Sequence, residues 1–271
     1  MSKSNFWSSI ETAKDVESKL PAAVKSAART LRVIEFFVEV RRRARANEIA
    51  DRLGLPQSSA SALLNSMVRL GYLDFDYATH TFQPTLRVAM LGAWLEDGPF
   101  RDGSMVSMIE GLANETGHAV SLSTRNDIHV RYMYTIQSRD PAVARITLAI
   151  RRYAVWSASG MALLASKPQG DVKALIRRTR AEDDPFVRQI KAAQVLERLD
   201  EATRQGYSFS RGLVTQGAGS IAMKLPSSLT GDHEEIALSV AGDLEKLTNA
   251  ETKIVTLIRD AVAALETKHA R

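Results

Sequence analysis

The chain of 271 residues contains no cysteine, which excludes disulfides and thiolate chemistry. No apolar run approaches the ~20 residues that a membrane-spanning helix needs, so we expect no contact with a membrane. The five histidines show neither H-x-x-x-H nor H-x-H spacing, and no G-x-S-x-G motif is present. The sequence therefore predicts no catalytic residue, no metal and no cofactor, although a Ser–His–Asp triad assembled from distant residues stays open.

The N-terminus also lacks a targeting signal. Its sequence, MSKSNFWSSIETAKD, has no apolar core followed by small residues, so we expect a cytoplasmic protein. The hydrophobic fraction of 45% and the charged fraction of 25% are ordinary for a soluble globular protein. The length allows one large domain or two domains of usual size.

Most of the excess positive charge lies in the N-terminal third of the chain. The net charge is +5, and residues 22–90 contribute +4 of it, with ten Lys or Arg against six Asp or Glu. Arg41, Arg42, Arg43 and Arg45 cluster in this region. Such a cluster either neutralises DNA phosphates, which gives affinity without sequence information, or forms a solvated helix end.

Residues 46–70 have the pattern of a helix, a tight turn and a second helix. Gly54 favours the left-handed conformation that ends a helix, and Pro56 cannot continue it. Ser58 or Ser59 is expected to cap the second helix, because a serine hydroxyl satisfies free backbone N–H groups. The buried stripe of that helix is predicted to contain Ala60, Leu63, Leu64, Met67 and Leu70.

The second helix keeps a polar outward face, with short side chains that allow a close approach to DNA bases. Residues 75–82 follow with aromatic residues on both sides of a polar turn, as in a hairpin. This order predicts a winged helix-turn-helix that reads the major groove, although a simple packing unit of two helices has the same pattern. The predicted DNA contacts are Arg29, Arg43, Arg45, Gln57, Ser58, Ser59, Ser61, Ala62, Asn65 and Arg69.

Within this set, the amides and the arginines are given different roles. Asn65 and Gln57 are the candidates for base readout, because a carboxamide pairs bidentately with adenine. The four arginines are candidates for phosphate contacts.

The chain is predicted to divide into four segments. Residues 1–21 are an N-terminal arm, and residues 22–83 are the DNA-binding domain, whose first helix turns Leu31, Ile34 and Val38 inward. Residues 84–98 are a linker that contains an apolar helix over residues 86–95, and residues 99–271 are the last domain.

The C-terminal part mixes helices and strands without a regular βαβ repeat, which predicts an α+β domain. Helices are expected over residues 104–116, 157–166, 185–205 and 249–268. Strands are expected over residues 119–124, 130–136, 145–150, 221–225 and 236–240.

In the order of its motifs, the chain resembles the IclR family of bacterial transcription regulators. The N-terminal match begins at Val24 and includes E-I-A-x-x-L-G-L-P-x-S at residues 48–58 and L-G-Y-L at residues 70–73. Weaker matches are L-A-x-E-T-G at 112–117, R-Q-G-Y at 204–207, G-S-I-A at 219–222 and A-L-S-V at 237–240. The resemblance extends from about residue 22 onward.

This resemblance implies a winged helix-turn-helix, a linker helix and a GAF-like α/β domain that binds a small organic effector, often a carboxylate or an aromatic compound. It also implies a homodimer or a dimer of dimers on a palindromic operator in double-stranded DNA. Carried onto this sequence, the family's effector-binding residues are Ser157, Ala158, Ser159, Gly160, Met161, Ser220 and Ser239.

The chain departs from the family's pattern at several of these positions. Ala62 and Asn65 stand where relatives often have basic residues, so the operator should differ. Met161 stands where a lysine is usual. Arg211 lies in a stretch that is normally acidic, which either favours an anionic effector or places an arginine on the surface.

Two other features allow alternative interpretations. Residues 217–222 fit G-x-G-x-x-A, but a strand-like stretch follows where a dinucleotide site needs a helix, so we interpret them as a Gly-rich turn. Tyr132, Tyr134 and Trp156 either pack against the sheet or line the effector pocket, and the second case favours an aromatic or apolar effector.

Together these features predict a sequence-specific DNA-binding transcriptional regulator, not an enzyme, controlled by a small organic effector. The alternative is a small-molecule sensor or enzyme domain with a degenerate helix-turn-helix. A third hypothesis is a DNA-binding regulator that has lost ligand control. The sequence leaves open whether the protein represses or activates, and whether it is a dimer or a tetramer.

Overall fold

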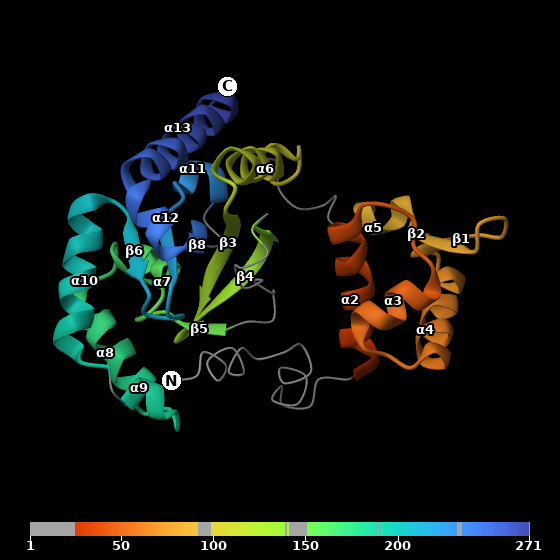
Figure 1. The fold of residues 1–271 in the computed structure, drawn as a ribbon, viewed down its shortest axis with the longest axis horizontal. Helices are drawn as coiled ribbons and strands as arrows, with labels where there is room; N and C mark the ends of the chain where they lie inside the picture. Colours follow the sequence, from red (N-terminus) through yellow and green to blue (C-terminus); the bar gives the residue numbers. More distant parts are fainter. Residues whose placement is uncertain are drawn as a thin grey trace. The chain divides into compact units, whose positions relative to one another are not determined.

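The structure is a computed structural model that describes residues 25–91, 99–138, 140, 151–188, 190–231 and 235–270. These residues form two compact units, residues 25–91 and residues 99–270 (Figure 1). The predicted N-terminal arm, residues 1–21, lies outside the described residues. Among those that are described, no helix combines the length and the hydropathy needed to cross a bilayer.

The N-terminal unit is a winged helix-turn-helix, as predicted. Its elements are α2 (Lys25–Val40), α3 (Ala46–Leu53), α4 (Gln57–Arg69), β1 (Leu73–Asp76), β2 (Thr81–Pro84) and α5 (Leu86–Met90). β1 and β2 form an antiparallel hairpin in which Phe75 lies opposite Phe82. The core between the helices and the hairpin contains Val33, Phe36, Phe37, Ala44, Ile49, Leu53, Leu64, Met67, Leu73 and Phe82.

The face that α2 buries is only partly the predicted one, because Ile34 packs against the core but Leu31 and Val38 do not. Leu31 and Val38 are 64% and 49% exposed, whereas Phe36 and Phe37 are buried. Apolar residues surround most of this helix, so periodicity alone does not select a face. The two phenylalanine rings, edge to face at 5.2 Å, remove the largest apolar area from water and decide the orientation.

Two smaller expectations for this unit also need correction. Pro56, not a serine, occupies the N-cap of α4, and no side chain caps this helix. Leu70 follows the helix and is 62% exposed, outside the buried stripe. The linker helix is described only over Leu86–Met90, and residues 92–98 lie outside the described part. The left-handed Gly54, with φ of 65°, ends α3 as predicted.

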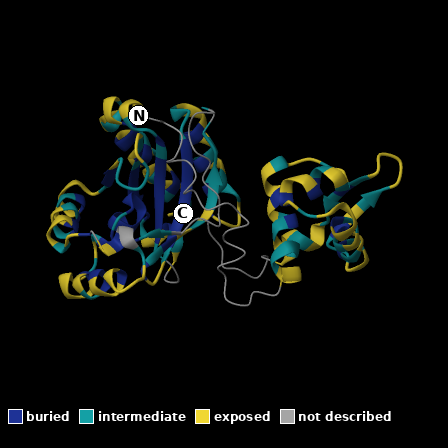
Figure 2. Cartoon of the chain, turned by 60° about the horizontal axis from the view of Figure 1, so that its bottom comes forward, coloured by how far each residue is buried: buried dark blue, intermediate teal, exposed yellow. Residues whose placement is uncertain are grey.

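The C-terminal unit is built on one antiparallel sheet in the order β5-β4-β3-β8-β7-β6, which confirms the α+β fold. The strands are β3 (Ala119–Asn126), β4 (His129–Ile136), β5 (Arg151–Tyr153), β6 (Ser208–Arg211), β7 (Ala218–Lys224) and β8 (Ile236–Asp243). The central strands β3 and β8 are buried along most of their length (Figure 2). Both faces of the sheet are therefore covered.

One face of the sheet is apolar. It packs against α6 (Ser104–Thr116), α12 (Leu244–Asn249) and α13 (Glu251–His269). The strand residues in this core include Val120, Leu122, Ile221, Met223, Leu238 and Val240.

The opposite face is lined by small polar residues, and α7 (Ala158–Leu164) packs on it. Paired residues of neighbouring strands point to the same side of a sheet. The register pairs Ser121 with Ser239, Ser239 with Ala222, and Ser220 with Ser210. We call the residues Ser121, Ser123, Ser208, Ser210, Ser220 and Ser239 the serine face. α10 (Ala192–Gln205) packs against α7 and extends the layer.

The predicted helix over residues 185–205 is wrong. It is two helices, α9 (Pro185–Arg188) and α10, because Lys191 before α10 has an extended backbone. No glycine or proline marks this break. The sequence analysis also missed α8 (Gln169–Arg180), α11 (Ser227–Thr230), α12 and β6, whereas the helix expected over residues 249–268 is α13. The strand predicted over residues 145–150 lies outside the described residues.

Candidate nucleic-acid interface and ligand site

One stripe of α4 is turned to solvent. Ser58, Ala62, Asn65 and Arg69 follow each other at helical spacing and are exposed. The opposite side of the helix carries the buried Ala60, Leu64 and Met67, which hold it against α3 and the hairpin. The stripe therefore lies on a helix whose orientation is fixed by the core behind it.

The other predicted contacts of α4 lie beside this stripe. Gln57 and Ser59 are exposed in the first turn, and Ser61 is half-buried. The Ser66 hydroxyl donates to the Ala62 carbonyl at 2.8 Å, and Arg69 Nη2 donates to Ser66 Oγ at 3.4 Å. The amide of Asn65 makes no side-chain hydrogen bond with another described residue, so it is available for a base edge.

The basic cluster before α3 is divided between internal ion pairs and solvent. Arg42 forms a bidentate pair with Glu48, whose pKa is lowered by the hydrogen bond from that guanidinium. Arg43 lies 3.7 Å from Asp74 and 3.5 Å from Asp76, between α3 and the hairpin. Only a charge that is not already neutralised releases counterions efficiently from DNA.

Two further arginines of the predicted set differ in their surroundings. Arg45 is exposed at the N-cap of α3 and has no partner among the described residues. Arg29 is half-buried on α2. Arg45 is therefore better placed than Arg29 or Arg43 to meet a phosphate.

The tip of the hairpin is fixed by local hydrogen bonds. Asp76 Oδ1 accepts from the Ala78 N–H at 2.8 Å and from the Thr79 N–H at 3.2 Å, and these bonds lower the pKa of Asp76. His80 closes the turn in the left-handed region, with φ of 53°. Tyr77 is 83% exposed at the tip. The wing thus presents an aromatic and an imidazole side chain on a turn of defined shape.

The first turn of α7 holds five of the predicted effector-binding residues. All five, Ser157 to Met161, are buried. The Ser157 hydroxyl caps the helix by accepting from the Gly160 N–H at 3.2 Å. A Cβ atom at Gly160 would lie 2.1 Å from the Ala154 carbonyl oxygen. Gly160 therefore has a packing role, whatever its part in ligand binding.

The structure brings Ser220 and Ser239 onto the sheet face that α7 covers. Ser159, Ser208, Ser210 and Ser239 are buried and Ser220 is half-buried, and none of these five forms a side-chain hydrogen bond within the described part of the chain. A group of hydroxyls without partners is a set of ready contacts for a polar ligand.

Sequence reasoning missed four members of the serine face: Ser121, Ser123, Ser208 and Ser210. Ser121 accepts a hydrogen bond from Thr135 Oγ1 at 3.1 Å. The signal that could have found them is alternation, because serine occupies every second position in residues 119–124 and 207–211. Only the register between strands shows that they share one face.

The three aromatic residues have different positions. Tyr134 packs into the apolar core on the α6 side. Tyr132 is paired with Ser123, so it lies on the serine face. Trp156 precedes α7, donates from Nε1 to the Leu213 carbonyl at 3.0 Å, and lies under the Arg198 guanidinium at 5.4 Å. Burial lowers the pKa of Arg198 to about 10.

Arg211 is a surface residue held by its own chain. Its Nη2 donates to both carboxylate oxygens of Glu251, at 2.9 and 2.8 Å, and its guanidinium stacks 4.0 Å from the Phe209 ring centre. Since Glu251 already neutralises this charge, the structure gives no support to Arg211 as an anchor for an anionic effector.

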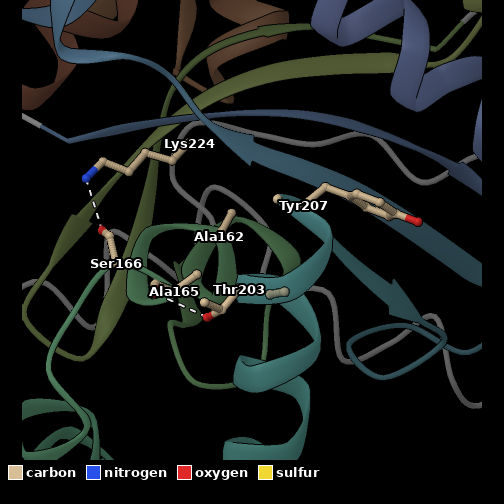
Figure 3. Close-up of a pocket in the computed structure, with 8 residues that line it drawn as sticks. Ala162, Ala165, Ser166, Thr203, Tyr207 and Lys224 are labelled. Atoms are coloured by element: carbon tan, nitrogen blue, oxygen red, sulfur yellow. Dashed lines mark hydrogen bonds between the residues drawn. The ribbon is translucent and has the colours of Figure 1, made fainter.

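A shallow pocket of about 240 Å³ opens at the other end of α7 (Figure 3). It is lined by Ala162, Ala165, Ser166, Ala202, Thr203, Gly206, Tyr207 and Lys224. Lys224 Nζ donates to Ser166 Oγ at 3.1 Å and also pairs with Glu235. None of the predicted effector-binding residues lines this pocket. No group of three or more possible metal ligands occurs among the described residues.

Two family models match the chain and together span most of it. The IclR helix-turn-helix domain matches residues 26–76, and the bacterial transcriptional regulator IclR C-terminal model matches residues 103–267. No curated protein matches the chain.

Solved structures with the same fold cover nearly the whole chain. The IclR family transcriptional regulator from Brucella abortus is 23% identical, with a TM-score of 0.51, covering 95% of this chain and 96% of its own. The Thermotoga maritima IclR is 14% identical, with a TM-score of 0.57 and coverages of 92% and 100%. An IclR homolog from Microbacterium hydrocarbonoxydans, complexed with 4-hydroxybenzoate, is 22% identical, with a TM-score of 0.56 and coverages of 90% and 99%.

The two matched models agree with the two compact units, one a winged helix-turn-helix and the other an α/β domain on a single antiparallel sheet. The chain therefore belongs to the IclR family of transcriptional regulators, with a DNA-binding helix-turn-helix domain followed by the family's C-terminal domain.

Proposed function

We propose that this regulator reads a palindromic operator with α4 and responds to a small organic effector bound between α7 and the serine face. In this proposal, residues 22–83 are the DNA-binding domain, residues 84–98 the linker and residues 99–271 the effector-binding domain. The single observation that carries it is the exposed stripe of α4, in which the unbonded amide of Asn65 stands on a helix held by a buried core. Because the proposed regulator binds chromosomal DNA, we expect it in the cytoplasm.

Base readout is assigned to Asn65 and Gln57, with Ser58, Ser59, Ser61 and Ala62 allowing the close approach that these amides need. Arg45 and Arg69 are the principal phosphate contacts. Arg29 and Arg43 are secondary ones, because Arg43 first has to release Asp74 and Asp76. The operator should therefore have adenine at the base positions that Asn65 and Gln57 contact.

The effector is assigned to Ser157, Ala158, Ser159, Gly160, Met161, Ser220 and Ser239. Support comes from the burial of α7 on the serine face and from the hydroxyls there without partners. The homolog complexed with 4-hydroxybenzoate makes a carboxylate or aromatic compound a reasonable class. For the effector to control binding, it must prefer one arrangement of the protein over another.

A homodimer, or a dimer of such dimers, is part of the proposal. Leu86, Met90 and Leu91 in and after α5 are 78%, 65% and 56% exposed. This apolar surface is large for a helix of five residues and suits burial against a second copy. A two-fold dimer also matches the symmetry of a palindromic operator.

The test is a gel-shift with the DNA upstream of the protein's own gene, at two salt concentrations and with nonspecific competitor. We expect a discrete shift that survives competitor. Asn65→Ala should lose discrimination between operator variants by about 1–3 kcal/mol. Asn126→Ala, which changes an exposed amide of the C-terminal unit, is the matched control and should behave as wild type. Smeared, salt-labile binding by wild type, or unchanged sequence preference in Asn65→Ala, would contradict the proposal.

A further inference from the structure

Arg152 occupies an unusual place on the sheet. It lies on β5 and is paired with Val130 of β4, so its side chain is on the same face as Val130 and Tyr132. Val130 is fully buried in an apolar cluster with Met161 of α7. This is the sheet face that α7 covers, and Arg152 is half-buried at its β5 edge.

The charge of Arg152 is not compensated by the described part of the chain. The strands place three cations on this face: Arg125, Arg152 and Lys224. Lys224 pairs with Glu235, and Arg125 Nη1 donates to the Asp127 carbonyl at 2.9 Å. Arg152 has no carboxylate and no carbonyl partner among the described residues. A half-buried guanidinium without such a partner is costly to keep, which makes it a candidate for ligand binding.

Its neighbour is the hydroxyl of Tyr132. Burial raises the pKa of Tyr132, and the nearby Arg152 guanidinium partly opposes that rise. Tyr132 is paired with Ser123 of the serine face. A guanidinium, a phenol and a set of serine hydroxyls therefore lie on one side of the sheet, next to the apolar side chains of Val130 and Met161.

This combination fits one class of ligand. A guanidinium offers parallel N–H donors that match the two oxygens of a carboxylate. The phenol adds a neutral hydrogen-bond donor beside it. We propose that the effector is a monocarboxylic acid whose carboxylate is bound by Arg152 and the Tyr132 hydroxyl. This inference rests on the proposed function, since it names the ligand class of the same site.

The test measures binding of paired acids and amides to the purified full-length chain by calorimetry. The probes are benzoate, 4-hydroxybenzoate, phenylacetate and hexanoate, each beside its neutral amide. At least one acid should bind, and its amide should bind at least tenfold more weakly. Arg152→Leu should weaken the acid at least tenfold, as expected for loss of a charge-assisted pair, and Tyr132→Phe should weaken it less.

Arg131→Leu is the matched control. Arg131 is the exposed arginine on the opposite face of the same strand pair, and its removal should leave acid binding unchanged. Because an uncompensated charge is removed, Arg152→Leu should melt at or above the temperature of wild type, which a purely structural arginine would not show. Arg152→Gln provides a second variant if the leucine chain does not fold.

Three results would overturn the inference: no acid of the panel binds, an amide binds as well as its acid, or both Arg152 variants retain the acid. Failure of the proposed function is recognised separately, by loss of operator binding in the gel-shift. Arg152→Leu should still shift the operator, and the bound acid should alter that shift in wild type only.

Discussion

Gly160 offers a sharp test of how α7 is held on the sheet. Replacing it by alanine would place a Cβ 2.1 Å from the Ala154 oxygen, 2.4 Å from its Cα and 2.6 Å from its carbonyl carbon. All three atoms are backbone, so no side-chain rotation relieves the clash, and α7 or the segment before it has to move. Overpacking of this kind costs about 1–3 kcal/mol, and a backbone obstacle favours the upper end.

Gly111 is the matched control for this substitution. It also lies inside a helix, α6, but a Cβ there meets no atom within 4 Å. Gly111→Ala should therefore stabilise the chain by about 0.5–1 kcal/mol, because alanine is the better helix former. The two variants should differ by about 3 kcal/mol in the free energy of unfolding.

Urea denaturation followed by far-UV circular dichroism measures this difference. DNA binding by the N-terminal unit should persist in Gly160→Ala below its transition, whereas acid binding should weaken. Equal stability of the two alanine variants would refute the packing role of Gly160 and leave ligand contact as its only role.

Three further predictions follow from the structure. Burial lowers the pKa of His118 below its usual value of 6.5, so the contribution of this group to stability is complete above pH 6.5 and decreases as pH falls. His118→Gln should therefore flatten the dependence of the unfolding free energy on pH between 5 and 8. An unchanged slope would exclude His118 as the source of that dependence. Arg45→Ala should reduce the slope of log K against log salt for operator binding by about 0.9. Arg42→Ala removes a charge that is already paired with Glu48, so it should change this slope less. Equal changes in the two variants would contradict the assignment of Arg45 as a phosphate contact. Leu86→Asp should weaken dimerisation, measured by analytical ultracentrifugation at low micromolar concentration. Arg87→Asp, at the exposed neighbouring position, is the control. A fully dimeric Leu86→Asp chain would count against α5 as the dimer contact.

The N-terminal unit could be predicted closely because its signals are local. Gly54 and Pro56 mark the turn between two helices, and the aromatic residues flanking residues 76–81 mark the hairpin. The inward face of α2 could not be predicted, since apolar residues surround it and only the packing of Phe36 and Phe37 decides which side is buried.

In the C-terminal unit, β3, β4, β7 and β8 were predictable, whereas β6 and the arrangement of the strands were not. The serine face depends on the register of four antiparallel strands, so Ser208 and Ser210 join Ser239 only after β6 and β7 are paired. The break at Lys191 carries no glycine or proline. Arg211 stood out in the sequence because a carboxylate is usual there, yet Glu251, forty residues away, already neutralises it.

Arg152, unlike Arg211, stands out in the structure but not in the sequence. Nothing in its local sequence, two arginines followed by a tyrosine, distinguishes it from its neighbours. Its interest comes from tertiary structure alone, namely the pairing with Val130, the proximity of Tyr132 and the lack of a described anionic partner. Ligand contacts of this kind are set by the sheet register and so escape a pattern search.

The most direct test of the central claim is selection of DNA by the full-length protein from a pool of random duplexes. Sequence reading by α4 in a two-fold dimer predicts enrichment of an inverted repeat, with half-sites about one helical turn apart or a multiple of it. It also predicts that Asn65→Ala relaxes the preference at one position in each half-site. A pool that remains unenriched, or a motif that Asn65→Ala selects unchanged, would contradict the account.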